Sequence, residues 1–172
     1  MGDSAVVSSG TDLSSPFRAR AFGAIVCGGF AVGVLDILDA TIFFGLKYGV
    51  TPIRVLWSVA AGLIGRERAI NGGLKTALLG LFLHFLIAFI MATVFYGVSL
   101  VLPTLIRHAV IWGMIYGVAA YFVMTYVVVP LSAAPPRPAP PWPVFLNGVI
   151  GHALLVGLPI ALCARWSAKP RS

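Results

Sequence analysis

Four long apolar segments constrain this chain more than any other feature of its sequence. They cover approximately residues 21–46, 74–102, 108–131 and 143–164. A helix of about 20 apolar residues crosses a membrane core about 30 Å thick, so each segment is long enough to span a bilayer. Only 10% of the 172 residues are charged, against about 25% in a soluble domain. The sequence therefore predicts an all-α polytopic membrane protein built as a four-transmembrane-helix bundle.

A shorter apolar segment, residues 51–64, lies between the first two spans. Thr51 is suited to a helix N-cap and Pro52 to the first helical position. About 13 apolar residues give roughly 20 Å of helix, too short to span. We expect a re-entrant or interfacial helix here, and an extended connector at the proline-rich "SAAPPRPAPPW" between spans three and four.

The segments predict one domain with two tails. Residues 18–166 form a single transmembrane bundle, residues 1–17 a disordered N-terminal tail and residues 167–172 a short C-terminal tail.

The net charge of +7 does not indicate nucleic-acid binding, because the basic residues flank the apolar segments without interleaved aromatic residues. Each membrane face receives six of them. One face has Arg18, Arg20, Arg107, Arg165, Lys169 and Arg171, and the other has Lys47, Arg54, Arg66, Arg68, Lys75 and Arg137. The flanks of the first and last spans favour cytoplasmic termini.

The two cysteines, Cys27 and Cys163, fall toward the same membrane face, near the start of span one and the end of span four. A disulfide between them is compatible with this placement. We expect instead two small core residues, because these positions lie in hydrocarbon.

Small residues repeat at helical spacing in every span and predict the faces along which the helices meet, since close backbone approach drives association in lipid. The packing glycines are Gly29, Gly33, Gly80, Gly113, Gly117 and Gly148.

Polar groups share these faces at one depth. At 1.5 Å per residue, two aspartates of span one and one histidine each of spans two and four fall in a single slab, which the short helix also approaches. The candidate ion or proton site comprises Asp36, Asp39, His84 and His152, with Arg54, Ser58, Tyr121 and Tyr126 in support.

Two interpretations compete. Desolvation favours the neutral form of a carboxyl group and histidine titrates near neutrality, so neighbours of these types can exchange protons or hold a cation. Alternatively, buried Asp and His only hold helices together in a membrane scaffold or partner subunit, and Asp39 forms an ion pair with Lys47 or Arg54 at the membrane edge.

No catalytic constellation is present, so we predict a protein that is not an enzyme. Two Asp and two His offer ligands for a divalent metal ion, and His84 with His152 offers axial ligands for haem. The spacing matches no metal motif and the chain has no other redox feature, so we predict no cofactor. Besides the lipid bilayer, a homodimer or a partner membrane protein is compatible with so small a bundle.

Residues 76–160 resemble the YagU-like family of bacterial inner-membrane proteins. The resemblance rests on "LHFLIAFIMATVFYGVSLVLP", "IWGMIYGVAAYFVMTYVVVPLSAAPP" and "NGVIGHALLVGLP", and on His84, Tyr96, Pro103, Pro130 and the Gly151–His152 pair. It implies a multi-span protein of the inner membrane and adds weight to the two histidines. It supplies no reaction and does not extend to Asp36 and Asp39.

Overall fold

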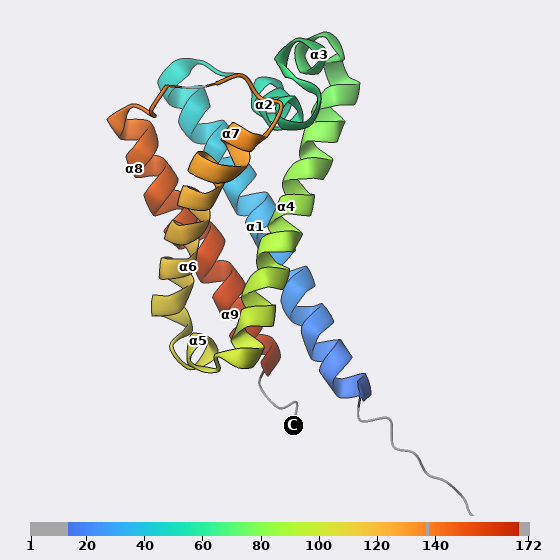
Figure 1. Cartoon of the computed structure of the whole chain (residues 1–172), viewed down its shortest axis with the longest axis vertical. Helices are drawn as coiled ribbons and strands as arrows, with labels where there is room; N and C mark the ends of the chain where they lie inside the picture. Colours follow the sequence, from blue (N-terminus) through green and yellow to red (C-terminus); the bar gives the residue numbers. More distant parts are fainter. Residues whose placement is uncertain (1–13, 137, 169–172) are drawn as a thin grey trace, which may run out of the picture.

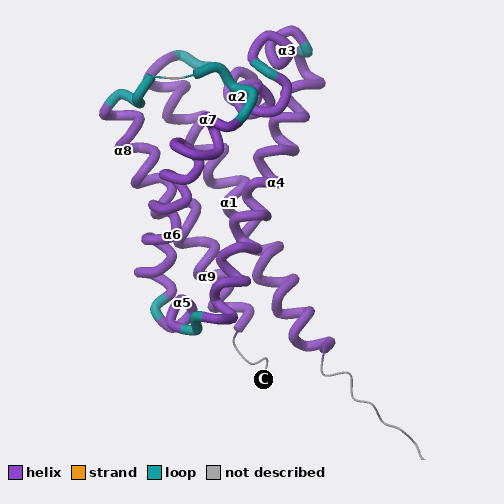
Figure 2. The backbone as a smooth tube through the Cα atoms, viewed as in Figure 1, coloured by secondary structure: helices purple, strands orange, loops and turns teal. Residues whose placement is uncertain are grey.

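The computed structural model describes residues 14–136 and 138–168, and within them it is all-α (Figures 1 and 2). Four helical stretches are long and apolar enough to cross a membrane: Ala21–Tyr48, Gly73–Val101, Ala109–Leu131 and Trp142–Ala168. The predicted four-span architecture is confirmed. Most of the predicted tails lies outside the described residues, but Ser14–Phe17 already belong to the first helix.

The first two spans are uninterrupted helices, α1 (Ser14–Tyr48) and α4 (Gly73–Val101). Between them lie the apolar helix α2 (Pro52–Ile64) and the short α3 (Arg66–Asn71), at the opposite end of the bundle from the start of α1 (Figure 1). The predicted short helix is thus confirmed. Pro52 occupies its first turn as expected, although the Thr51 side chain makes no capping hydrogen bond.

The short helix α5 (Thr104–Arg107) leads into the last two spans, and both of these contain π-helical turns. Span three comprises α6 (Ala109–Val123), η1 (Met124–Val128) and α7 (Val129–Leu131). Span four comprises α8 (Trp142–Gly151), η2 (His152–Gly157) and α9 (Leu158–Ala168).

A proline explains each π turn. Pro130 follows η1 and Pro159 follows η2. Proline lacks an N–H donor and its ring collides with the carbonyl four residues earlier, so an α-helical bond is lost there. A widened turn absorbs this mismatch. Pro130 lies at the end of its span, whereas Pro159 alters the geometry of span four in its middle.

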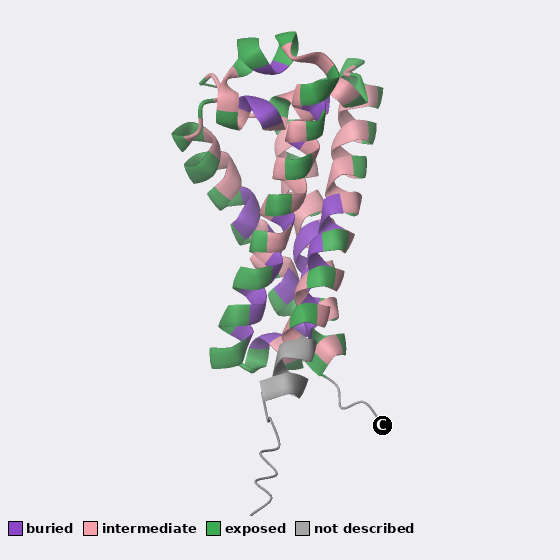
Figure 3. Ribbon diagram, turned by 90° about the vertical axis from the view of Figure 1, so that its right-hand side faces the viewer, coloured by how far each residue is buried: buried purple, intermediate pink, exposed green. Residues whose placement is uncertain are grey.

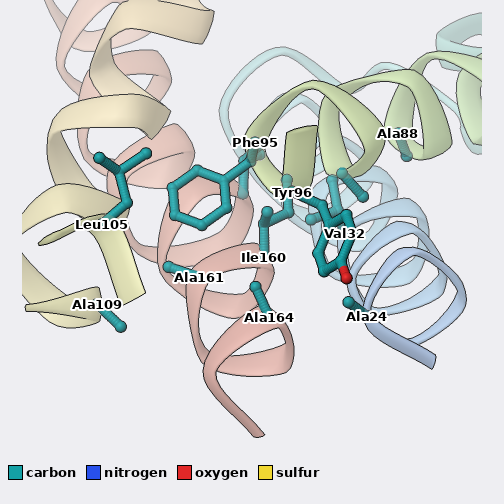
Figure 4. Packing of buried hydrophobic residues seen from close by; sticks show 12 residues of the cluster. Ala24, Val32, Ala88, Phe95, Tyr96, Leu105, Ala109, Ile160, Ala161 and Ala164 are labelled. Atoms are coloured by element: carbon teal, nitrogen blue, oxygen red, sulfur yellow. The ribbon is translucent and has the colours of Figure 1, made fainter. Parts of the chain in front are cut away.

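The main hydrophobic core fills the end of the bundle near the termini, which we call the packed half (Figure 4). There Phe95 of α4 is fully buried and points toward Leu105 and Ala161. The Tyr116 hydroxyl donates a hydrogen bond of 2.8 Å to the Met91 carbonyl, and its ring centroid lies 5.1 Å from that of Phe95. Spans one, two, three and four all contribute to this core.

A disulfide joins Cys27 of α1 to Cys163 of α9 in the packed half. Their Cα atoms are 5.8 Å apart. The expectation of two unlinked cysteines is therefore corrected. The physical reason is the close approach of spans one and four next to it, where a Cβ on Gly28 would lie 3.4 Å from the Ile160 backbone.

The packing glycines fall into two groups. A Cβ on Gly80 would overlap the Leu56 carbonyl of α2, and one on Gly117 would overlap the His152 carbonyl, so these glycines permit backbone-to-backbone contact. Gly113 likewise meets the Gly157 backbone. By contrast, Gly29, Gly33 and Gly148 make room for the aromatic rings of Phe89, Phe85 and Tyr121.

Figure 3 shows exposed positions along the helices, and many of them on all four spans are large apolar residues. Phe22 is 70% exposed and Phe82 is 63% exposed, for example. Large apolar surface is rare on soluble monomers but suits contact with lipid. The bundle therefore has the surface expected of a membrane-embedded protein.

Candidate functional site

One cavity of about 590 Å³ brings together two of the four candidate ionisable residues, Asp36 and His84. It lies among α1, α2, α3, α4 and the proline-rich connector. Arg54 and Ser58, predicted as supporting residues, line it as well. The short helix α2 thus lies next to the first two spans at the depth of the polar groups, where the sequence analysis expected it.

Asp36 and His84 lie at the inner end of this cavity. Asp36 is twelve residues before the end of α1 at Tyr48, or roughly 18 Å along the helix axis. His84 is eleven residues after the start of α4 at Gly73, or roughly 16 Å. Both side chains are half-buried. The cavity therefore reaches from the end of the bundle toward the middle of the spans.

His84 is oriented by a hydrogen bond to the first span. Its Nε2 lies 2.9 Å from the Gly33 carbonyl oxygen. A carbonyl can only accept, so Nε2 carries the proton, and in the neutral imidazole Nδ1 is an acceptor. The same Gly33 leaves room for the Phe85 ring next to His84. One glycine thus positions both neighbours from α4.

Asp36 differs from His84, since it forms no hydrogen bond or ion pair with any residue in the described part of the chain. Ser58 is nearby in the cavity wall, but its hydroxyl donates to the Val55 carbonyl at 2.7 Å. Arg54 and a second arginine, Arg66 of α3, are the cationic residues of the wall. The cavity therefore contains a carboxylate, an imidazole and two guanidinium groups.

Asp39 faces a different neighbour. Its Oδ2 accepts a hydrogen bond of 2.8 Å from the Asn147 Nδ2 of α8, and a Cβ on Gly151 would lie 3.2 Å from the same oxygen. An amide in span four thus takes the place of the ion pair with Lys47 or Arg54. Asp39 is not among the residues that line the cavity.

His152 also lies apart from the cavity. Its ring packs edge-on against Tyr121 of α6, with centroids 5.4 Å apart. Tyr121 is buried, whereas Tyr126 is 53% exposed and stacks on Phe122. The four residues predicted to share one site therefore have different neighbours in the structure. They separate into the Asp36–His84 cavity, the Asp39–Asn147 pair and the His152–Tyr121 contact.

The π turns supply the physical reason for part of this separation. A fixed 100° per residue places side chains around an α-helix, but a π turn adds a residue and changes the direction in which the later side chains face. His152 opens η2. Asp39 separates for a simpler reason, since it is three residues after Asp36 and so about 60° away around α1.

Within residues 14–136 and 138–168, no three His, Cys, Asp or Glu side chains are grouped closely enough to hold a metal ion. His84 is bonded to α1, whereas His152 contacts α6.

Sequence reasoning missed three residues of these sites. Arg66 and Trp57 line the cavity, and Asn147 holds Asp39. In the sequence, Arg66 was counted only among the basic residues that flank the apolar segments. Asn147 had a usable signal, because it is a polar residue inside an apolar span.

Family models, characterised proteins and solved structures give no match to this chain. Fold and composition therefore define the class directly: an integral membrane protein with four transmembrane helices and an apolar helix between the first two.

Proposed function

We propose that Asp36 and His84 form a proton- or cation-handling site at the inner end of the cavity. The observation that supports this proposal is that one carboxyl group and one imidazole, from two different spans, line the same cavity of about 590 Å³. Ionisable groups within spans are costly and usually mark ion pathways or proton relays. The proposal omits Asp39 and His152 from this site.

The cavity suggests access from one end of the bundle only. The main core, including Phe95 and Ile160, occupies the opposite end. A proton or cation would therefore enter past α2 and the connector and stop at Asp36 and His84. Passage across the membrane would require a further conformational change, so binding or sensing is the simplest use of the site.

Proton uptake by protein reconstituted in liposomes tests this proposal. An Asp36→Asn substitution keeps the size of the side chain and removes its titration, so we expect loss of any pH-dependent or ion-dependent response. Asp39→Asn is the matched control, because Asp39 has a similar position in the span but bonds Asn147. His84→Gln and His152→Gln form the second pair. Equal responses in the members of each pair would contradict the proposal.

The alternative is a non-catalytic membrane scaffold or partner subunit. It is favoured by the Asn147–Asp39 and His84–Gly33 hydrogen bonds, which each connect two spans. Under this alternative no ion response occurs, and the substitutions change only thermal stability or recovery of a complex.

We further propose a non-enzymatic protein of the bacterial inner membrane, as the YagU-like resemblance implies, acting as a homodimer or with a membrane partner. The basic flanks favour cytoplasmic termini. Crosslinking in native membranes tests the association, and fusions of a reporter to each terminus test the orientation.

A further inference from the structure

We propose that the cavity binds a small amphipathic organic anion, with its charged group at Arg54 and Arg66 and its apolar body against the cavity wall. The inference goes beyond the proton or cation site and does not depend on it. It uses the arginines of α2 and α3, whereas the proposed function uses Asp36 and His84.

The size and wall of the cavity suit such a ligand. Its volume of about 590 Å³ lies within the range of roughly 300–1,000 Å³ for small-molecule sites. Such sites combine mostly apolar walls with a few polar groups that fix orientation. The apolar wall includes Ile37, Phe44, Val55, Trp57, Val59 and Ile70.

The charges of the wall select an anion. The wall has two guanidinium groups, on Arg54 and Arg66, and one carboxylate, on Asp36, so its cationic groups outnumber its anionic groups. Neither arginine forms an ion pair with a carboxylate in the described part of the chain. A guanidinium offers paired donors that match a carboxylate or phosphate group. Arg54 and Arg66 are both exposed and both line the wall, so the charged group would be held where the guanidinium groups remain hydrated.

The wall is held in place before any ligand binds. The Trp57 Nε1–H donates to the Gly73 carbonyl at 2.9 Å, which fixes the indole against the start of α4. The Ala133 N–H donates to the Gly62 carbonyl at 2.9 Å, which ties the connector to α2. Gly80 lets α2 rest directly on α4. A site ordered in advance loses less entropy on binding.

Fluorescence of Trp57 provides the test. The other tryptophans, Trp112, Trp142 and Trp166, are 38%, 67% and 61% exposed, so replacing them by Phe should leave the fold intact. In nanodiscs of phosphatidylcholine, a brominated medium-chain carboxylate should quench Trp57 saturably. The matching brominated alcohol should not saturate, because it lacks the anionic group.

Substitution of the arginines sharpens the test. The double substitution Arg54→Gln with Arg66→Gln should lower the affinity for the brominated carboxylate about tenfold or more, because charge-assisted hydrogen bonds are lost. Arg68→Gln is the matched control, since Arg68 is exposed on α3 but does not line the cavity. If the double variant does not fold, Ala40→Phe fills the cavity from α1 while keeping both arginines, and it should abolish saturable quenching.

Three results would overturn the proposal: saturable quenching by the alcohol, unchanged affinity in the folded arginine variants, or unchanged affinity in Ala40→Phe.

A fourth result concerns the source of the anion. If brominated phosphatidylglycerol quenches Trp57 more than brominated phosphatidylcholine and the arginine substitutions remove the difference, the site holds a lipid headgroup instead. Loss of a proton response in Asp36→Asn with carboxylate binding intact would separate this site from the proposed function.

Discussion

The two ends of the bundle are built differently. In the packed half, near the termini, side chains from all four spans form one continuous core around Phe95 and Ile160. At the other end, the buried apolar cluster is small and consists of Ala60, Ala61 and Ala69, and a cavity of about 590 Å³ lies beside it. One end closes the bundle and the other leaves space within it.

This difference separates stability from a binding role. The packed half depends on close packing, in which added side-chain volume forces the neighbouring groups to move. The cavity half has ionisable residues, and Asp36 among them has no bonding partner in the described part of the chain. Substitutions in the packed half should therefore cost more stability than substitutions around the cavity, and four predictions test this, from the largest expected effect to the smallest.

Gly117→Leu should have the largest effect, because it acts on a backbone-to-backbone contact between spans three and four. A Cβ alone would overlap the His152 carbonyl, so these two spans must separate. We expect a loss of about 3 kcal/mol or more, the upper range for overpacking, measured by thermal unfolding in detergent. Gly97→Ala is the control, since a Cβ there has no atom within 4 Å. Equal losses would show that close packing at Gly117 is not needed.

Removal of the disulfide should come next. Cys27→Ser with Cys163→Ser opens a covalent loop of sequence separation 136. We expect a loss of about 2–4 kcal/mol, and the same loss when the native protein is reduced. Thermal unfolding with and without reductant measures both. If reductant still lowers the unfolding temperature of the double variant, the loss of stability does not come from the Cys27–Cys163 disulfide.

Gly80→Ala should have a smaller effect on stability, because it moves only α2. The new Cβ would overlap the Leu56 carbonyl, but α2 can shift away from α4 toward the cavity. We expect a loss of about 1–2 kcal/mol, the lower range for overpacking, together with a change in Trp57 fluorescence. Unaltered Trp57 fluorescence would contradict a shift of α2.

The two aspartates should give the smallest effect and the clearest contrast. Asp39→Ala removes the acceptor of Asn147 and should cost about 0.6–1.7 kcal/mol, as interhelical polar pairs in membranes do. A double-mutant cycle with Asn147→Ala isolates the coupling. Asp36→Ala should cost less than Asp39→Ala, because no bond is lost. The reverse order would assign the structural role to Asp36.

The spans were predictable because hydrocarbon thickness sets a minimum length. The predicted 74–102 and 108–131 differ from Gly73–Val101 and Ala109–Leu131 by one residue at most. The short helix was equally clear from Pro52 and the limited length of its apolar run. Span four extends four residues further than predicted, to Ala168, because its last turn includes Arg165, Ser167 and other residues without continuous apolar character.

The site was only partly predictable. Depth along a helix depends on residue number, and the sequence alone gives a similar depth to Asp36, His84 and Arg54, which line one cavity. Direction around the bundle needs the order and tilt of the helices, which depth does not supply. Asp39 and His152 have a suitable depth but face other partners. The Cys27–Cys163 disulfide was not predicted for the same reason, because whether the first and last spans are adjacent depends on the tertiary structure.

The Cys27–Cys163 disulfide has a consequence for which compartment each end of the protein meets. Disulfides persist on the periplasmic side of a bacterial membrane and are reduced in the cytosol. If the pair is oxidised in the cell, the ends of α1 and α9 that carry it face an oxidising compartment outside the cytosol, contrary to what the basic flanks favour. Arg54 and Arg66 would then draw their ligand from the cytosol. The oxidation state of two thiols thus reports which side of the membrane supplies the cavity.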